Sequence, residues 1–220
     1  MTSNEKMLEL LRSYKLEDLK RALEQNVRED HQKTVGNKKK DSAIINNMVK
    51  KSIANYPKQE RFEKCHSFIK DGKELFGLTD GYRIFISEND FGYEHAEEFE
   101  KFKFESMLSE SDKTNSFEID RNEISLFCKD HKTKALNDKP YVFRIDDEHF
   151  AAFNPRYLLD AIDFCSSSKI FYSPIQSNIL NTPILIKNEE ENKIALILPV
   201  YIQENYIAYM KSWKESYNVM

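Results

Sequence analysis

Apolar residues recur every three or four positions in four parts of the chain, and this spacing is typical of amphipathic helices. Ser42, Asp120 and Asn154 each stand where such a segment begins, and their side chains favour the N-cap position. Pro155 suits the first helical position. The lysine-rich stretch 31–42 predicts a loop. The predicted helices cover residues 5–28, 42–56, 120–131 and 154–165.

Between these segments the pattern changes to short runs rich in β-branched and aromatic residues, which predict strands. Asp71-Gly72 is a hairpin turn signal. The run 194–201 is almost continuously apolar, as in a strand buried on both faces, and Pro199 is expected at its end because proline cannot donate to a ladder. The predicted strands cover residues 62–69, 75–86, 117–119, 141–145, 149–153, 169–172, 184–187 and 194–201. This order predicts an α+β fold with helices packed on one face of an antiparallel sheet.

The composition indicates a protein with a substantial core. A length of 220 residues suits one domain, or at most two small ones. Hydrophobic residues make up 40% of the chain and include 15 Phe and 11 Tyr, which excludes an intrinsically disordered polymer. No apolar run is long enough for a membrane span, and the first residues lack the apolar segment of a signal peptide. We therefore expect a cytoplasmic protein.

Charge is distributed unevenly along the chain. The net charge of −4 excludes a uniformly basic nucleic-acid coat, but residues 33–51 carry six lysines against one acid. Residues 88–112 carry nine acids against two lysines and still hold five Phe and Tyr residues. We interpret 88–115 as a solvated acidic insertion that lays an apolar stripe on the core.

Three segments carry a resemblance to a known family. Residues 78–84 read LTDGYRI, residues 153–162 read FNPRYLLDAI, and residues 195–202 read ALILPVYI. In this order they resemble the ATDGHRL segment, the FNxxYLLDAL helix opening and the MPMRL or MPVRL end of the bacterial DNA polymerase III beta subunit, the sliding clamp. The regions that match cover about 42–88 and 117–202.

The resemblance implies one DNA-clamp-like domain with added terminal helices. The family has three similar domains, whereas this chain has room for one, and Tyr201 stands where the family has arginine. The implied division is an N-terminal helical extension over 1–32, a clamp-like domain over 33–202 and a C-terminal helix over 203–220.

In that family, a surface at a domain junction binds a short apolar peptide from replication or repair proteins. An apolar surface with a few polar groups suits such a ligand. The same residues would equally pack the sheet end against a helix, so both interpretations stay open. The implied peptide-binding pocket consists of Thr79, Gly81, Tyr82, Arg83, Ile84, Asn154, Tyr157, Leu196, Leu198, Pro199, Val200 and Tyr201.

The resemblance also implies DNA contacts, which require cations against phosphates. A solvated lysine loop is the alternative interpretation of the basic stretch. On the predicted helix 154–165, the positive charge of Arg156 is expected to be offset by the negative charges of Asp160 and Asp163. The candidate DNA-binding residues are Lys38, Lys39, Lys40, Lys50 and Lys51.

The sequence predicts no enzyme, metal site or cofactor. Cys65, Cys128 and Cys165 are scattered, without a CxxC pair, and are expected to be small buried residues. The five histidines show no ligand spacing. The acidic sets 146–149 and 118–123 match no recognised catalytic pattern.

We therefore expect a sliding-clamp-like accessory protein of DNA replication or repair, whose partners are proteins with an apolar clamp-binding peptide and, as a second candidate, double-stranded DNA. The alternative is a clamp-mimicking regulator that does not encircle DNA. A monomer or small oligomer is favoured over a ring of six copies. The C-terminal segment 203–220 carries an aromatic stripe that is expected to pack on its own domain, with a cover over the adjacent pocket or an interface with another subunit as the alternatives. The stripe consists of Tyr206, Tyr209, Met210, Trp213 and Tyr217.

Overall fold

The computed structural model describes residues 39–97, 104, 108, 115–131, 139–145, 149–173 and 182–218. The chain divides into two compact units, 1–42 and 43–220. Only residues 39–42 of the first unit are described, and their backbone is helical. The predicted helix over 5–28 lies outside the described residues. Of the helices in the described ranges, none has the length and apolar character needed to cross a membrane.

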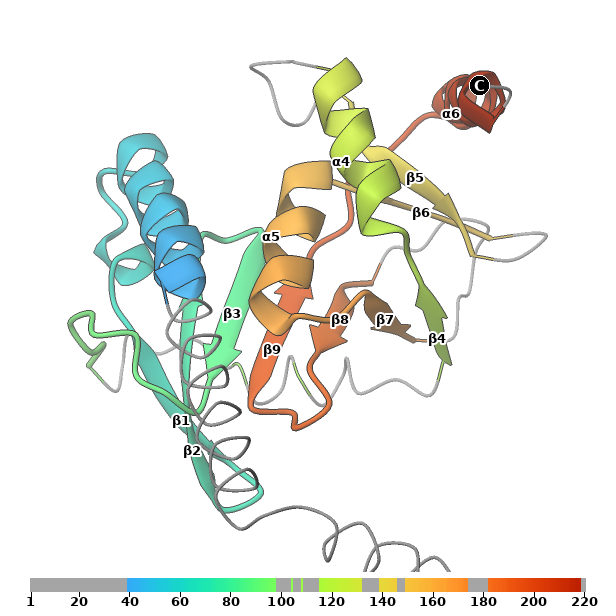
Figure 1. The fold of residues 1–220 in the computed structure, drawn as a ribbon. Helices are drawn as coiled ribbons and strands as arrows, with labels where there is room; N and C mark the ends of the chain where they lie inside the picture. Colours follow the sequence, from blue (N-terminus) through green and yellow to red (C-terminus); the bar gives the residue numbers. More distant parts are fainter. Residues whose placement is uncertain are drawn as a thin grey trace, which may run out of the picture. The chain divides into compact units, whose positions relative to one another are not determined.

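An antiparallel sheet of seven strands forms the centre of the second unit, in the order β1-β2-β3-β9-β8-β7-β4 (Figure 1). A separate two-stranded hairpin consists of β5 and β6. The strands are β1 His66–Lys70, β2 Lys73–Thr79, β3 Arg83–Ser87, β4 Asn115–Glu118, β5 Tyr141–Arg144, β6 Phe150–Phe153, β7 Lys169–Tyr172, β8 Ile184–Lys187 and β9 Lys193–Ile197. The pairing of β3 with β9 joins the two strands that carry the first and last of the family-like segments.

Helices α4 (Arg121–Asp130) and α5 (Pro155–Cys165) begin where capping side chains predicted them to begin. Asp120 Oδ1 accepts a hydrogen bond from the Asn122 N–H at 2.7 Å, and Asn154 Oδ1 accepts one from the Arg156 N–H at 3.0 Å. Each bond satisfies one of the donors that a helix start leaves unpaired. The helical segments are 39–55, the 3-10 helix η1 Glu60–Phe62, α4 Arg121–Asp130, α5 Pro155–Cys165 and α6 Glu204–Asn218.

The sheet is covered on both faces. Along β3, Phe85 belongs to the larger core cluster, which includes the buried side chains of α5, whereas Ile84 and Ile86 belong to a second cluster. This alternation follows from the two-residue period of a strand. Phe104 and Leu108 of the acidic segment are buried in the second cluster. The predicted α+β fold is confirmed, and the acidic segment contributes apolar side chains to the face of the sheet opposite α5.

Four predicted boundaries are wrong. The predicted strand 62–69 begins only at His66, because Glu60–Phe62 form the 3-10 helix η1. Residues 39–41 are already helical, so the helix begins before Ser42. Lys39 and Lys40 therefore lie in this helix rather than in a loop. The predicted strand 75–86 is divided into β2 and β3 by a turn, because side chains around Asp80 bond the backbone there. The predicted strand 194–201 ends at Ile197, since the chain around Pro199 leaves the sheet.

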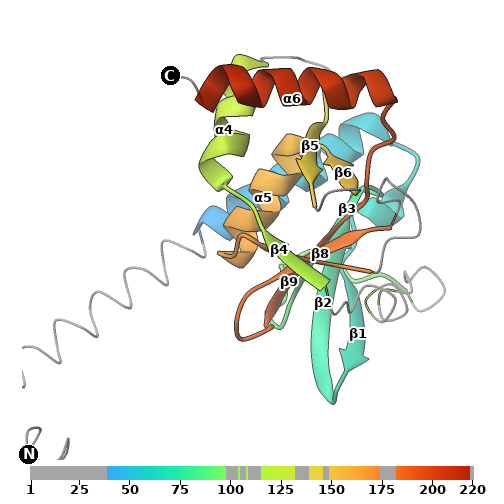
Figure 2. The same ribbon diagram turned by 90° about the vertical axis from the view of Figure 1, so that its right-hand side faces the viewer.

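Helix α6 lies beside α4 and the β5–β6 hairpin (Figure 2). Met210 is buried, and the Trp213 ring meets the Phe127 ring of α4 edge-on at 5.0 Å. Trp213 Nε1 donates a hydrogen bond to Asp130 Oδ2 at 3.3 Å. The aromatic stripe of the C-terminal helix therefore packs on its own domain, as predicted.

Candidate functional site

The turn between β2 and β3 is shaped by its own side chains. Asp80 Oδ1 accepts hydrogen bonds from the N–H groups of Tyr82 and Arg83, both at 3.0 Å. Thr79 Oγ1 donates to the Arg83 carbonyl oxygen at 2.8 Å and accepts from the Gly81 N–H at 3.0 Å. Gly81 has a φ of +87°, a conformation that glycine adopts without steric cost. The TDGYR sequence is therefore a locally determined turn that leaves the Tyr82 side chain 43% exposed.

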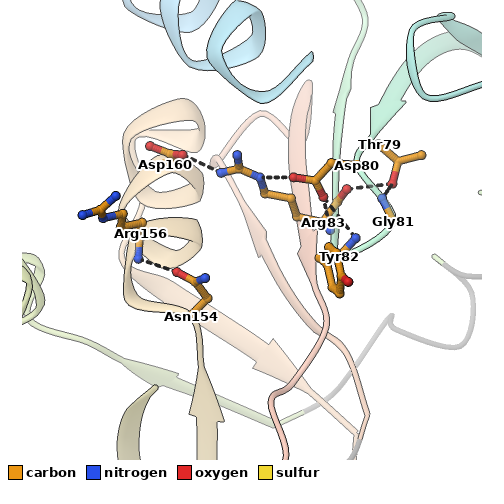
Figure 3. A network of polar contacts seen from close by, with 8 residues as sticks. All are labelled: Thr79, Asp80, Gly81, Tyr82, Arg83, Asn154, Arg156 and Asp160. Carbon is orange, nitrogen blue, oxygen red and sulfur yellow. Dashed lines mark hydrogen bonds and ion pairs between the residues drawn. The ribbon is translucent and has the colours of Figure 1, made fainter. Parts of the chain in front are cut away.

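Arg83 is buried and neutralised within the chain. Its side chain is 1% exposed, its Nε donates to Asp80 Oδ2 at 3.0 Å, and its Nη1 donates to Asp160 Oδ2 of α5 (Figure 3). Its Cζ lies 4.3 Å from the centroid of the Tyr157 ring, a cation–π contact. Because two carboxylates and an aromatic face surround the guanidinium, Arg83 holds the turn against α5 and does not offer its charge to an external ligand.

Three tyrosines gather beside this network. The Tyr56 and Tyr82 hydroxyl oxygens are 2.9 Å apart, and this hydrogen bond is the main cause that raises the pKa of Tyr56. The centroids of the Tyr82 and Tyr157 rings are 6.4 Å apart. Burial raises the pKa of Tyr157 to about 12, with a smaller contribution from the negative charge of Asp80. The three tyrosines form an aromatic patch, and the bonded hydroxyl groups of Tyr56 and Tyr82 lie at its surface.

The segment after β9 brings the third family-like sequence to the same place. The Leu198 N–H donates to the Tyr82 carbonyl oxygen at 2.9 Å, and the Val200 N–H donates to the Ala152 carbonyl oxygen of β6 at 2.8 Å. Tyr201 follows with 86% of its surface exposed. Backbone hydrogen bonds thus join the segment after β9 to the β2–β3 turn and to the end of β6, the strand that leads into α5.

The predicted pocket residues do not all face one surface. Ile84 and Leu196 are 4% and 1% exposed and belong to the second core cluster, against which Leu198 packs. Tyr157 packs against the first cluster, on the other face. Asn154 is 1% exposed, and its side chain caps α5. Leu198 is half-buried but packs on the second cluster. Apart from it and glycine, the predicted residues that retain exposed or half-buried surface around the turn are Tyr82, Tyr157, Pro199, Val200 and Tyr201. We call these five residues the tyrosine-proline surface.

The candidate DNA-binding lysines are only partly described. Lys39, Lys40, Lys50 and Lys51 are exposed on helix 39–55, and Lys38 lies outside the described residues. The expected offset of Arg156 by Asp160 and Asp163 is wrong. Asp160 pairs with Arg83 of β3, and Asp163 accepts two hydrogen bonds from Arg121 of α4, so both carboxylates tie α5 to neighbouring elements.

Two of the other acidic residues singled out in the sequence, Asp120 and Glu123, have structural roles. Asp120 caps α4, and Glu123 forms an ion pair of 3.1 Å with Lys214 of α6. Residues 146–148 lie outside the described part of the chain. The three cysteines are free thiols; Cys65 and Cys165 are buried and Cys128 is half-buried.

Comparison with known proteins identifies the fold. No protein-family model matches the chain, and no curated protein matches its sequence. The solved structure of the C. crescentus beta sliding clamp matches with a TM-score of 0.50 and 9% identity, over 74% of this chain and 64% of that one. The fold is that of a sliding clamp.

Two further clamp structures are similar at lower TM-scores. The sliding clamp of Bartonella birtlesii, solved with bound griselimycin, has a TM-score of 0.49 and 13% identity, over 67% of this chain and 60% of that one. The DNA polymerase III beta subunit of Thermotoga maritima has a TM-score of 0.33 and 15% identity, over 59% of this chain and 42% of that one. The present chain thus spans less than two thirds of the length of these clamp chains.

Sequence reasoning missed the partners that hold the turn in place. Asp80 lay inside the TDG motif, and an Asp before Gly in a turn is a signal for side-chain bonding to the backbone. Asp160 was assigned to the wrong arginine, because a contact between residues 77 positions apart leaves no trace in local spacing. No sequence pattern indicated that Tyr56 forms a hydrogen bond with Tyr82.

Proposed function

We propose that this protein is a non-enzymatic, sliding-clamp-like accessory factor of DNA replication or repair that binds partner proteins. The tyrosine-proline surface receives a short apolar peptide of the partner. The observation that carries the proposal is the meeting of the three family-like segments, through the Leu198–Tyr82 hydrogen bond and the Arg83–Asp160 ion pair, on a clamp fold. Aromatic side chains and proline supply the apolar contact area that such a peptide needs.

The site combines a rigid turn with exposed aromatic side chains, and both properties support peptide binding. The network of Arg83, Asp80 and Asp160 fixes the backbone of the turn, and a fixed turn lowers the entropy lost when a ligand orders the Tyr82 side chain. Because the Tyr82 and Tyr201 side chains are exposed, a bound Leu or Phe side chain would remove their apolar surface from water.

The test is binding of a fluorescent peptide that carries Leu and Phe anchors, followed by fluorescence anisotropy. Tyr82→Ala and Tyr201→Ala should each weaken binding about tenfold, a typical loss for an aromatic anchor worth more than about 1 kcal/mol. Ile69→Ala is the matched control, because Ile69 is 66% exposed on β1 but belongs to no family-like segment. Equal weakening by all three variants, or no binding to the unmodified protein, would contradict the proposal.

Double-stranded DNA is the second proposed partner, with the lysines of helix 39–55 as its contacts. The net charge of −4 and the buried, paired Arg83 favour the alternative function, a regulator that mimics a clamp domain without encircling DNA. Retention on circular but not linear DNA, lost at high salt, would support encirclement. Capture of a polymerase or clamp loader without any DNA retention would support the mimic.

A charge-reversal pair separates specific DNA contacts from general electrostatics. The double variant Lys50→Glu/Lys51→Glu should abolish retention and reduce its salt dependence. The double variant Lys129→Glu/Lys211→Glu makes the same charge change at exposed lysines of α4 and α6 and should retain most binding. Equal losses in the two variants would exclude a dedicated DNA surface on helix 39–55.

Assembly decides between the two functions. The strands β1 and β4 stand at the two ends of the sheet, so a ring of copies would pair β1 of one copy with β4 of the next. We favour a monomer or small oligomer, because the net negative charge and the acidic segment oppose close association of copies. Light scattering over a concentration series tests this: a constant mass near 26.0 kDa supports a monomer, and a mass six times larger supports the ring.

A further inference from the structure

A cysteine, an aspartate and a histidine, none of which belongs to a family-like segment, converge at the start of β1. The ligand atoms of Cys65, Asp90 and His95 all lie within 4.8 Å of one another. The backbone brings them together. Cys65 and His95 form a parallel β-bridge, in which the Cys65 N–H donates to the Glu94 carbonyl oxygen at 2.7 Å and the Ala96 N–H donates to the Cys65 carbonyl oxygen at 2.9 Å.

The two outer groups are already oriented. Asp90 Oδ1 accepts a hydrogen bond from the Gly92 N–H at 2.9 Å, and its Oδ2 lies 3.0 Å from His95 Nε2. Two ligands of a tetrahedral zinc ion, each at about 2.0 Å from the metal, are separated by about 3.3 Å. The carboxylate oxygen and the imidazole nitrogen therefore stand at nearly the spacing that zinc requires.

Cys65 is the buried member of the three, whereas Asp90 and His95 are exposed. Cys65 has no exposed surface. Burial, together with the charge of Asp90, raises the pKa of its thiol to about 11, and backbone N–H groups of Phe91, Gly77 and His66 oppose this rise. Hydrogen bonds to ligand sulfurs also occur around iron–sulfur clusters, where they tune the metal site.

We propose that Cys65, Asp90 and His95 bind one zinc ion, with water at the fourth position. One sulfur, one nitrogen and one oxygen are donor types that zinc accepts together, whereas magnesium and calcium prefer oxygen alone. On binding, the Cys65 thiol proton passes to solvent and the thiolate coordinates the metal. The bound ion would tie the segment that carries Asp90 and His95 to β1, and so add to the stability of the sheet edge.

The test uses Co²⁺ as a spectroscopic replacement for zinc on the full chain after removal of metal by a chelator. One Co²⁺ should bind per chain, give the absorption bands of a tetrahedral site with a thiolate-to-cobalt charge-transfer band, and be displaced by zinc. Zinc itself should raise the melting temperature. Cys65→Ser should remove the charge-transfer band, and Cys128→Ser should keep it.

Two surface variants keep the test valid even if Cys65→Ser fails to fold. His95→Ala and Asp90→Asn change side chains that are 48% and 44% exposed, and each should weaken Co²⁺ binding by about tenfold or more. His31→Ala is the histidine control and should leave binding unchanged. Octahedral Co²⁺ spectra without the sulfur band, or full binding in His95→Ala, would overturn the proposal.

Discussion

Arg83 Nη1 of β3 donates a hydrogen bond to Asp160 Oδ2 of α5, and this contact joins two segments that are 77 residues apart in the chain. The arginine side chain is 1% exposed, whereas Asp160 is 28% exposed. The same guanidinium also reaches Asp80, in its own turn. The buried guanidinium of Arg83 thus holds the β2–β3 turn in a fixed position against α5.

Arg83→Met should be strongly destabilising. Methionine fills much of the volume but leaves the carboxylate of Asp80 without its cation, and the loss of one partner of a buried pair costs about 3–5 kcal/mol. Arg121→Met is the matched control, because Arg121 forms a similar pair with Asp163 but is 45% exposed. The control should lose less than about 1 kcal/mol. Urea unfolding measures both, and similar losses would show that burial does not strengthen the Arg83 pair.

Asn154 provides a test of the α5 start. Asn154→Ala removes the side-chain acceptor for the Arg156 N–H and should lower the free energy of unfolding by about 1 kcal/mol or more, since the site is buried. Asn154→Asp retains an acceptor and should recover most of that loss. A loss of the same size in both variants would show that the cap is not the source of the effect.

The fold followed from the sequence to the extent that its signals are local. The caps at Asp120 and Asn154 and the Asp71-Gly72 turn bond residues within a few positions, so the sequence pattern contains them. The pairing of Arg83 with Asp160 is determined by how β3 packs against α5, and local spacing does not encode it. For the same reason the apolar run 194–201 predicted burial correctly only as far as Ile197, where the chain bends to meet Tyr82 and Ala152.

Gly77 tests how Phe104 of the acidic segment packs on the sheet. A Cβ at residue 77 would overlap the Phe104 ring, so Gly77→Ala should lose about 1–3 kcal/mol by overpacking. Phe104→Leu should relieve part of that loss in the double variant, which a double-mutant cycle in urea unfolding detects.

Gly72→Ala supplies the control for this cycle. Nothing lies within 4 Å of its Cβ position, but its φ of +77° is strained for alanine and should cost about 1–2 kcal/mol. Phe104→Leu should not change that cost. If Phe104→Leu reduces the loss of stability in neither Gly77→Ala nor Gly72→Ala, Phe104 does not pack on Gly77 in solution.

Tyr157 should make stability depend on pH in the alkaline range. Burial holds its pKa at about 12 in the folded state, against 10.0 for an ordinary tyrosine. Between these values the unfolded chain has lost the hydroxyl proton and the folded chain retains it, so the folded state binds more protons and its stability falls as pH rises from about 10 to about 12.

Tyr157→Phe keeps the ring beside Arg83 but removes this proton, so its free energy of unfolding should fall less steeply over the same window. Tyr201→Phe is the control, because that side chain is 86% exposed and is in water in both states. Parallel pH profiles for the unmodified protein and Tyr157→Phe would contradict the assignment of a raised pKa to Tyr157.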